Sequence, residues 1–175
     1  MKGRGRAYKE DRVRGGTAHA ALVFVGDDAV AWAEYGPPEE LPNIHHRREY
    51  LKTADLLPDY RITCLFVDRD HRRQGVARRA VEGALSLIAA AGGGVVESYP
   101  HDLPDGTKKN ASFLYNATRA MYEELGFAYV RPKGQGNCVM RTTVPPPGTA
   151  PRPPGLRCSR PGTAAGGPSS SPSRG

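Results

Sequence analysis

The chain has 175 residues and a formal net charge of +7, enough length for one domain. Residues 1–16 and 145–175 contribute +4 each, so residues 17–144 carry −1 and make no basic face by composition. Nucleic-acid binding could therefore involve only the two basic ends, and no apolar run reaches the roughly 20 residues of a membrane-spanning helix.

Residues 1–16 form a basic leader, in which the pattern predicts a short polar helix over 6–14 that ends at two glycines. The leader has no apolar centre, so it is not a secretory signal. Residues 21–36 contain two β-rich runs around Gly26, Asp27 and Asp28, which is typical of a β-hairpin. The polar stretch 37–60 is predicted to leave the sheet and to contain a helix within 45–54.

The apolar run 61–67 predicts a strand buried on both faces. From Gly75 onward, apolar residues recur at helical spacing until three glycines at 92–94 end the helix. Residues 94–100 predict another strand. A strand, a helix of about 16 residues and a second strand indicate a right-handed βαβ unit with parallel strands.

A loop over 100–110 leads into a second predicted helix, with Phe113, Leu114, Ala117, Met121 and Leu125 on one face. Residues 126–132 and 137–144 predict a closing hairpin. The element order indicates a mixed sheet of the α+β class. The last segment, 145–175, contains 9 of the 16 prolines and no acidic residue, and we expect it to be disordered. We thus expect a leader (1–16), one folded domain (17–144) and a tail (145–175).

The turn before the first long helix has the composition of a phosphate site. Gly75 stands where the helix begins, and a glycine there lets the backbone approach a ligand without a Cβ in the way. Unpaired N–H groups at a helix N-terminus attract phosphate, and Arg72, Arg73, Arg78 and Arg79 add positive charge. The turn therefore predicts binding of a phosphate or pyrophosphate. An ordinary basic helix start is the alternative.

Two motifs give this turn a context. The sequence RRQGVA at 72–77 resembles the R/Q-x-x-G-x-G/A signature of the GNAT superfamily of acyl-CoA-dependent N-acyltransferases. It lies between a buried strand and a helix, as in that family. The sequence MYEELGF at 121–127 resembles the family's late-helix pattern. The resemblance covers roughly residues 20–144, whereas the dinucleotide-binding and P-loop glycine patterns are absent from the sequence.

The resemblance implies a GNAT-like, mostly antiparallel sheet with a central parallel βαβ unit and helices on both faces. It also implies transfer of an acetyl group from acetyl-CoA, as cosubstrate, to an amine on a small molecule or a protein. Parallel strands of the family splay apart, and the pantetheine pairs with the strand that ends at 67. The implied acetyl-CoA contacts are Phe66, Val67, Arg72, Arg73, Gln74, Gly75, Val76, Ala77 and Asn116.

Catalysis in the family pattern is direct attack by the amine, with a tyrosine protonating the leaving thiolate. The resemblance aligns Tyr122 with this acid, and Tyr115 is the alternative. Asn116 lies six residues before Tyr122, one fewer than in the family. For the base, Glu97 is the first candidate, because it lies on the strand beside the gap that the splayed parallel strands open. Glu34, Asp68 and a chain of water molecules are the alternatives.

No metal is expected, because Cys64, Cys138, Cys158 and the adjacent His45 and His46 lack ligand spacing. The cysteine pattern suits a reducing, cytoplasmic compartment. The resemblance also implies a strand and helix before the leader helix, so the chain is expected to be a truncated or divergent form. A catalytically weak acyl-CoA-binding or partner-binding module with an incomplete acceptor site is therefore the alternative function. A homodimer stays open, and nucleic-acid binding is the third alternative.

Overall fold

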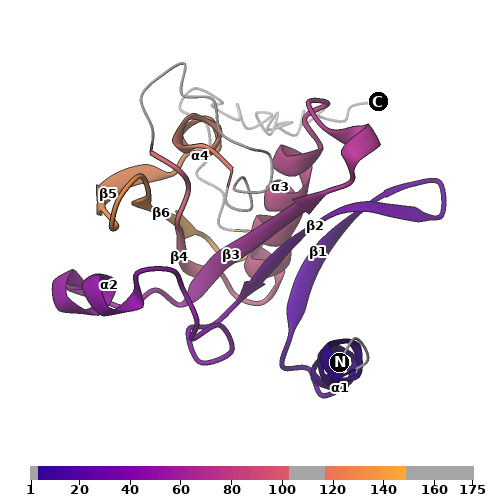
Figure 1. Ribbon diagram of the computed structural model, residues 1–175, viewed down its shortest axis with the longest axis horizontal. Coiled ribbons are helices and arrows are strands. Elements are labelled where there is room, and N and C mark those ends of the chain that lie inside the picture. The colour runs from indigo at the N-terminus through magenta and orange to yellow at the C-terminus, as the bar shows by residue number, and fades with distance from the viewer. Residues whose placement is uncertain (1–3, 103–116, 149–175) are drawn as a thin grey trace, which may run out of the picture.

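The computed structural model describes residues 4–102 and 117–148, and a single mixed sheet organises them (Figure 1). Its strands are β1 (His19–Val25), β2 (Asp28–Gly36), β3 (Tyr60–Val67), β4 (Gly94–Ser98), β5 (Ala128–Pro132) and β6 (Cys138–Val144). The helices are α1 (Arg4–Arg14), α2 (Arg47–Thr53), α3 (Val76–Ala90) and α4 (Arg119–Glu124), with a 3₁₀ turn η1 (Arg69–His71). None of these helices is long and apolar enough to cross a bilayer.

The strands lie in the order β1-β2-β3-β4-β6-β5. Among the strands of the described residues, only β3 and β4 are parallel, and α3 connects them as predicted; all the other neighbouring pairs are antiparallel. The predicted hairpin turn is present, since Gly26 has φ 59 and links β1 to β2. The predicted α+β class with a mostly antiparallel sheet and one parallel pair is confirmed.

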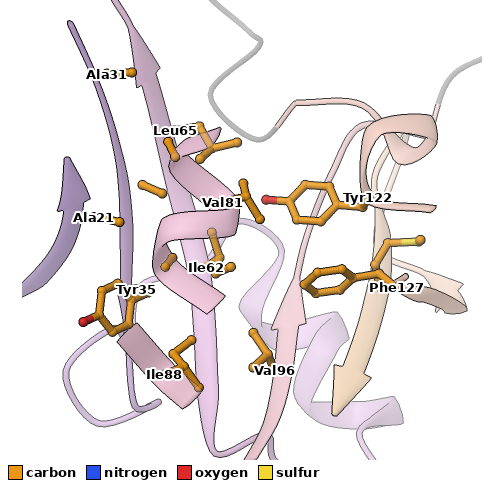
Figure 2. Packing of buried hydrophobic residues seen from close by; sticks show 14 of the residues in the cluster. Ala21, Ala31, Tyr35, Ile62, Leu65, Val81, Ile88, Val96, Tyr122 and Phe127 are labelled. Carbon is orange, nitrogen blue, oxygen red and sulfur yellow. The ribbon is translucent and has the colours of Figure 1, made fainter. Parts of the chain in front are cut away.

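The main core lies between the sheet and α3. The apolar residues at helical spacing explain why α3 packs there: Val76, Ala80, Val81, Ala84 and Ile88 are buried. Val81 and Ile88 face Ile62 of β3 and Val96 of β4 in the close view of the cluster (Figure 2). Small side chains on β2, such as Ala31 and Ala33, let the helix approach the sheet closely.

The other face of the sheet carries a smaller cluster of Ile44, Tyr50, Tyr99 and Val139 under α2. Helices therefore cover both faces, as expected. The prediction that residues 61–67 are buried on both faces is wrong for the end of β3, where Phe66 is 41% exposed. The physical reason is that α2 covers only the beginning of β3. The expected tail, beyond Gly148, lies outside the described residues.

Candidate functional site

The turn between β3 and α3 is built around two residues in the left-handed backbone region. Arg73 has φ 60, and Gly75, the N-cap of α3, has φ 74. Alternation of this kind turns successive N–H groups toward one side of the chain and forms an anion-binding nest. Gly75 has no side chain to cap the helix, and a Cβ built on it would meet no atom within 4 Å. The space in front of the helix is therefore open.

The N–H groups of this turn are available to a ligand. Within the described residues, those of Arg73, Gln74 and Gly75 donate no backbone hydrogen bond. The first N–H groups of α3 have no partner inside the helix because the preceding turn is missing. Residues 72–75 are all exposed. A side-chain hydrogen bond stabilises the turn: the side chain of Gln74 donates to the carbonyl of Asp70 at 3.1 Å.

The arginines around the turn differ in what they bind. Arg78 is occupied by two carboxylates, with its Nε 3.0 Å from Glu82 and a terminal nitrogen 3.0 Å from Glu124. Arg72 donates from Nε to the carbonyl of Val67 at 3.2 Å, which ties the turn to the end of β3. Neither Arg73 nor Arg79 has a carboxylate partner among the described residues, so both guanidinium groups can bind a phosphate.

β3 and β4 separate before β3 reaches this turn. They pair at only three positions, Tyr60 with Val96, Arg61 with Glu97 and Ile62 with Ser98. Ser98 closes the pairing by donating from Oγ to the carbonyl of Ile62 at 3.2 Å. Beyond this point the chain after β4 turns to β6, where Cys138 N–H donates to Pro100 at 3.1 Å.

The separation leaves one edge of β3 without a strand. β3 continues to Val67 and stays paired with β2 on its other side. Residues 64–67 therefore have no strand on the β4 side within the described part of the chain. This edge includes Phe66 and Val67, the residues predicted to contact the pantetheine. The predicted splay of the parallel pair is thus present, and it ends at the predicted phosphate turn.

Tyr122 on α4 is completely buried in the main core, with its ring 5.0 Å from that of Phe127. The ring reaches from α4 toward Val81 (Figure 2). Its hydroxyl has no hydrogen-bond partner among the described residues. Burial raises the pKa of Tyr122, and the nearby hydroxyl of Ser98 opposes that rise. A buried hydroxyl without a partner is unfavourable, and it lies close to the residue that closes the β3–β4 pairing.

Glu97 occupies the opposite face of the sheet and is also fully buried. Its carboxylate accepts hydrogen bonds from Tyr50 Oη at 2.7 Å, Tyr99 Oη at 3.2 Å and Arg141, whose nearer nitrogen lies at 2.7 Å. This network joins α2 to β4 and β6. The residue predicted as a base is therefore also a structural carboxylate at the centre of a polar cluster.

The sequence did not reveal the partners of Glu97. Tyr50 was part of a predicted polar excursion, and Arg141 belonged to a predicted strand. The sequence hinted at these two partners only because Arg141 interrupts the strand 138–144 and Tyr50 is the one tyrosine in a polar predicted helix. Three further cations bind the excursion: Arg61 donates to the carbonyl of Leu41 at 3.1 Å, Arg131 to Thr53 at 2.7 Å, and Lys133 to the carbonyl of His45.

The alternative bases have other contacts. Glu34 on β2 binds Lys9 of α1 and accepts from Thr63 at 3.3 Å. Asp68 caps η1 by accepting from the N–H of Asp70 at 2.9 Å. His45 and His46 lie with their rings 4.0 Å apart beside α2.

The predicted roles of two residues, a pantetheine contact and an alternative acid, cannot be compared with the structure. Asn116 and Tyr115 are not among the described residues. In the described part of the chain, no group of His, Cys, Asp and Glu side chains could hold a metal ion.

An apolar row crosses the sheet on the face opposite α3, at the end where β3 separates from β4. Leu22, Trp32 and Phe66 are cross-strand partners on β1, β2 and β3. The rings of Trp32 and Phe66 stack with centroids 6.4 Å apart. Leu22 is 53% exposed and Phe66 is 41% exposed, so this row forms an open apolar surface next to the free edge of β3.

No protein-family model and no curated protein matches the sequence. Similar solved structures exist. One, from Desulfovibrio desulfuricans, is assigned as an acetyltransferase of the GNAT family; it has 18% identity and TM-score 0.50, covering 82% of this chain and 83% of that one. The ribosomal-protein-S18-alanine N-acetyltransferase of Escherichia coli has 15% identity and TM-score 0.41, covering 79% of each chain. An acetyltransferase from Thermus thermophilus has 16% identity and TM-score 0.48, covering 79% of this chain and 71% of that one.

Proposed function

We propose that this chain, which has the GNAT fold, is an N-acetyltransferase that transfers the acetyl group of acetyl-CoA to an amine. The observation that carries the proposal is the direct succession of an edge of β3, residues 64–67, that no described strand covers, and an open anion-binding nest. The amide groups of the pantetheine arm of acetyl-CoA can pair with a strand edge, and its pyrophosphate can bind an anion-binding nest. The two features follow each other along the chain in the order that the ligand requires. The activity would reside in residues 17–144.

The pyrophosphate would bind at the start of α3. The N–H groups of residues 73–77 would donate to its oxygens, and the positive end of the helix dipole would add to the attraction. Arg72 orients the turn through Val67, while the guanidinium groups of Arg73 and Arg79 would neutralise phosphate charge. Val76 is buried and holds the helix start against the core. Ala77 has too small a side chain to block the ligand.

The pantetheine would pair as an extra strand with the free edge of β3, near Phe66 and Val67. This arrangement satisfies backbone groups of the protein and amide groups of the ligand at the same time. It would direct the thioester toward the point where Ser98 closes the β3–β4 pairing. Asn116 stays a predicted contact of the same arm.

The chemistry needs a nucleophile, a proton donor and a proton acceptor. The lone pair of a neutral amine attacks the thioester carbonyl carbon, a C–N bond forms and the C–S bond breaks. We propose that Tyr122 gives its proton to the leaving thiolate. Its buried hydroxyl, which has no hydrogen-bond partner among the described residues, supports this role; a tyrosine carries its proton at neutral pH, and burial raises its pKa further.

The amine proton must also leave. Glu97 is our candidate for the acceptor of this proton, and its contacts with Arg141, Tyr50 and Tyr99 support a structural role beside the catalytic one. The acceptor would approach from the face opposite α3, over Trp32 and Phe66. Glu34, which lies on β2 of the same face, is the second candidate.

An amine screen tests the proposal. The chain is incubated with acetyl-CoA and single amines, and the release of free thiol is followed. Turnover on one class of amine supports the enzyme, with acetylated product confirmed by mass spectrometry. Binding of acetyl-CoA without turnover on any amine would instead favour the alternative function, a CoA-binding module with an incomplete acceptor site.

A further inference from the structure

A hollow of about 560 Å³ lies at the end of the sheet where β3 begins. Its walls come from the start of β1, the end of β2, the segment after β2 and the residues that follow α3. Tyr60, the first residue of β3, lines it, whereas the proposed acetyl-CoA site begins near Val67. Eight strand residues separate the two ends by roughly 23 Å, so this hollow is not part of that site.

The charges around the hollow have one sign. Glu39, Glu40 and Asp59 line it, and no Lys or Arg is among the described residues of its wall. The end of α3 also contributes, because Ala91 and Gly93 lie in the wall. A helix C-terminus carries the negative end of the dipole. Carboxylates and dipole together favour a cation.

These carboxylates have few positive partners. Glu40 has His19 at 2.9 Å, which is a charged partner only when the imidazole is protonated. Asp59 accepts from the N–H of Val95 through one oxygen, Oδ2, at 2.7 Å. Glu39 is exposed and has no hydrogen bond or ion pair to a described residue.

Aromatic rings form the other part of the wall. Tyr35 and Tyr60 both line the hollow, and the imidazole of His19 lies 5.6 Å from the ring of Tyr35. Aromatic faces attract ammonium and guanidinium groups through their quadrupole. The hollow thus combines carboxylates with rings, which together suit an organic cation.

The hydroxyl of Tyr35 points to a ligand independently of the charges. Tyr35 is only 9% exposed, and no described residue forms a hydrogen bond with its hydroxyl. Because this oxygen is not one of the fully buried atoms without a partner, it is the accessible part of an otherwise buried side chain. In the close view the hydroxyl is directed away from the other labelled core residues (Figure 2), and the residue lines the hollow. Burial, Tyr60 and Glu40 raise the pKa of Tyr35, so it keeps a proton and two lone pairs for a bound group.

The size of the hollow distinguishes an organic cation from a metal ion. A metal ion needs several ligands at about 2.0–2.6 Å from one point. No group of three His, Cys, Asp or Glu side chains among the described residues meets this condition, and the volume far exceeds that of an ion. We propose that this hollow binds an organic cation through an ammonium or guanidinium group.

The same chemistry has two sources, a free amine and the chain's own arginines. The carbonyl of Val144 lies beside Gly93, which lines the hollow, and the sequence continues past Gly148 to Arg152, Arg157 and Arg160. The experiment below therefore includes a full-length variant in which these three arginines are replaced by glutamine.

Isothermal titration with agmatine, which carries both an ammonium and a guanidinium group, tests the proposal on the full chain. Butan-1-ol is the uncharged control. We expect saturable binding of agmatine and none of butan-1-ol. Glu39→Gln/Glu40→Gln should weaken binding by roughly tenfold or more, because two carboxylates near the cation are neutralised. Tyr35→Phe should weaken it about fivefold. Asp27→Asn, in the exposed β1–β2 turn, is the matched control and should leave it unchanged.

The outcomes separate the sources. Binding by the parent chain identifies a free amine as a ligand. Binding only by the Arg152→Gln/Arg157→Gln/Arg160→Gln variant shows that the chain's own arginines occupy the hollow, which also supports the proposal. If neither protein binds agmatine, or if Glu39→Gln/Glu40→Gln binds it as tightly as the parent, the proposal is overturned.

Discussion

Replacing Tyr122 by phenylalanine should lower turnover without lowering stability. The substitution removes one oxygen and keeps the ring against Phe127. Because the hydroxyl is buried and has no partner among the described residues, removing it relieves a desolvation penalty of about 1–3 kcal/mol. We therefore expect the free energy of unfolding to stay level or to rise by about 1 kcal/mol. A general acid is typically worth about 10²–10⁴-fold in rate, so turnover should fall by that order.

The assay has two parts. Urea unfolding followed by circular dichroism gives the stability, and thiol release with the best amine from the screen gives the turnover. Tyr50→Phe is the control for stability, because its hydroxyl donates to Glu97 at 2.7 Å. Loss of a bond to a charged group should destabilise that variant by about 1.5–3 kcal/mol.

The pH dependence gives a further check. Burial raises the pKa of Tyr122, so the acid stays protonated beyond the usual tyrosine range, and the high-pH limb of the parent's rate should lie above about pH 10. In Tyr122→Phe this limb should be absent. A variant that turns over like the parent would show that the ring only packs. A variant destabilised by more than about 1 kcal/mol would show that the hydroxyl has a partner in the folded chain.

The polar cluster and the tail give three further predictions. Glu97→Gln removes the buried carboxylate partner of Arg141 and leaves that guanidinium only the exposed Asp55 at 3.5 Å, so it should lower the free energy of unfolding by about 3 kcal/mol, measured in urea. An unchanged low-pH limb of the rate would eliminate Glu97 as the base. Burial, with Arg61 and Arg131 nearby, lowers the pKa of Lys133 from 10.5 to about 8. Between these two pH values the unfolded chain binds more protons than the folded chain, so Lys133 adds stability as the pH rises through this range. Side-chain NMR titration of Lys133 checks the value, and a midpoint near 10.5 would contradict it. A chain ending at Gly148 should bind acetyl-CoA as tightly as the full chain in a calorimetric titration, because the removed residues lie beyond the elements that form the site; a loss of roughly tenfold would show that the tail takes part.

The sequence predicted the elements that depend on local patterns. Apolar residues at helical spacing located α3, and the glycines at 92–94 gave its end. The turn before α3 was predicted from Gly75, which has a positive φ that only glycine adopts easily. The start of the β3–β4 connection, at the turn before α3, and its end, at the glycines after α3, were thus predicted from the sequence.

Features that depend on long-range packing could not be read. Glu97 lies on a short strand with apolar neighbours, and nothing local shows that Tyr50, 47 positions earlier, donates to it. The exposure of Phe66 depends on how far α2 extends over the sheet, which the run of apolar residues in β3 does not show. The hollow near Tyr35 assembles from segments that are distant in sequence.

Acetyl-CoA binding to Gly75→Val tests the central claim most directly. A Cβ at Gly75 meets no protein atom, so the valine would extend into the space of the proposed pyrophosphate. Gly26→Val is the matched control, since Gly26 also has a positive φ, 59, and open space, but lies in the β1–β2 turn. Both variants should lose about 1–2 kcal/mol of stability through backbone strain.

The measurement is calorimetric titration of the parent and both variants with acetyl-CoA. Loss of two charge-assisted hydrogen bonds is worth about 3 kcal/mol, so Gly75→Val should bind roughly a hundredfold more weakly. Gly26→Val should bind like the parent. Equal affinity of Gly75→Val and the parent, or no binding of acetyl-CoA by the parent, would contradict the assignment of this turn.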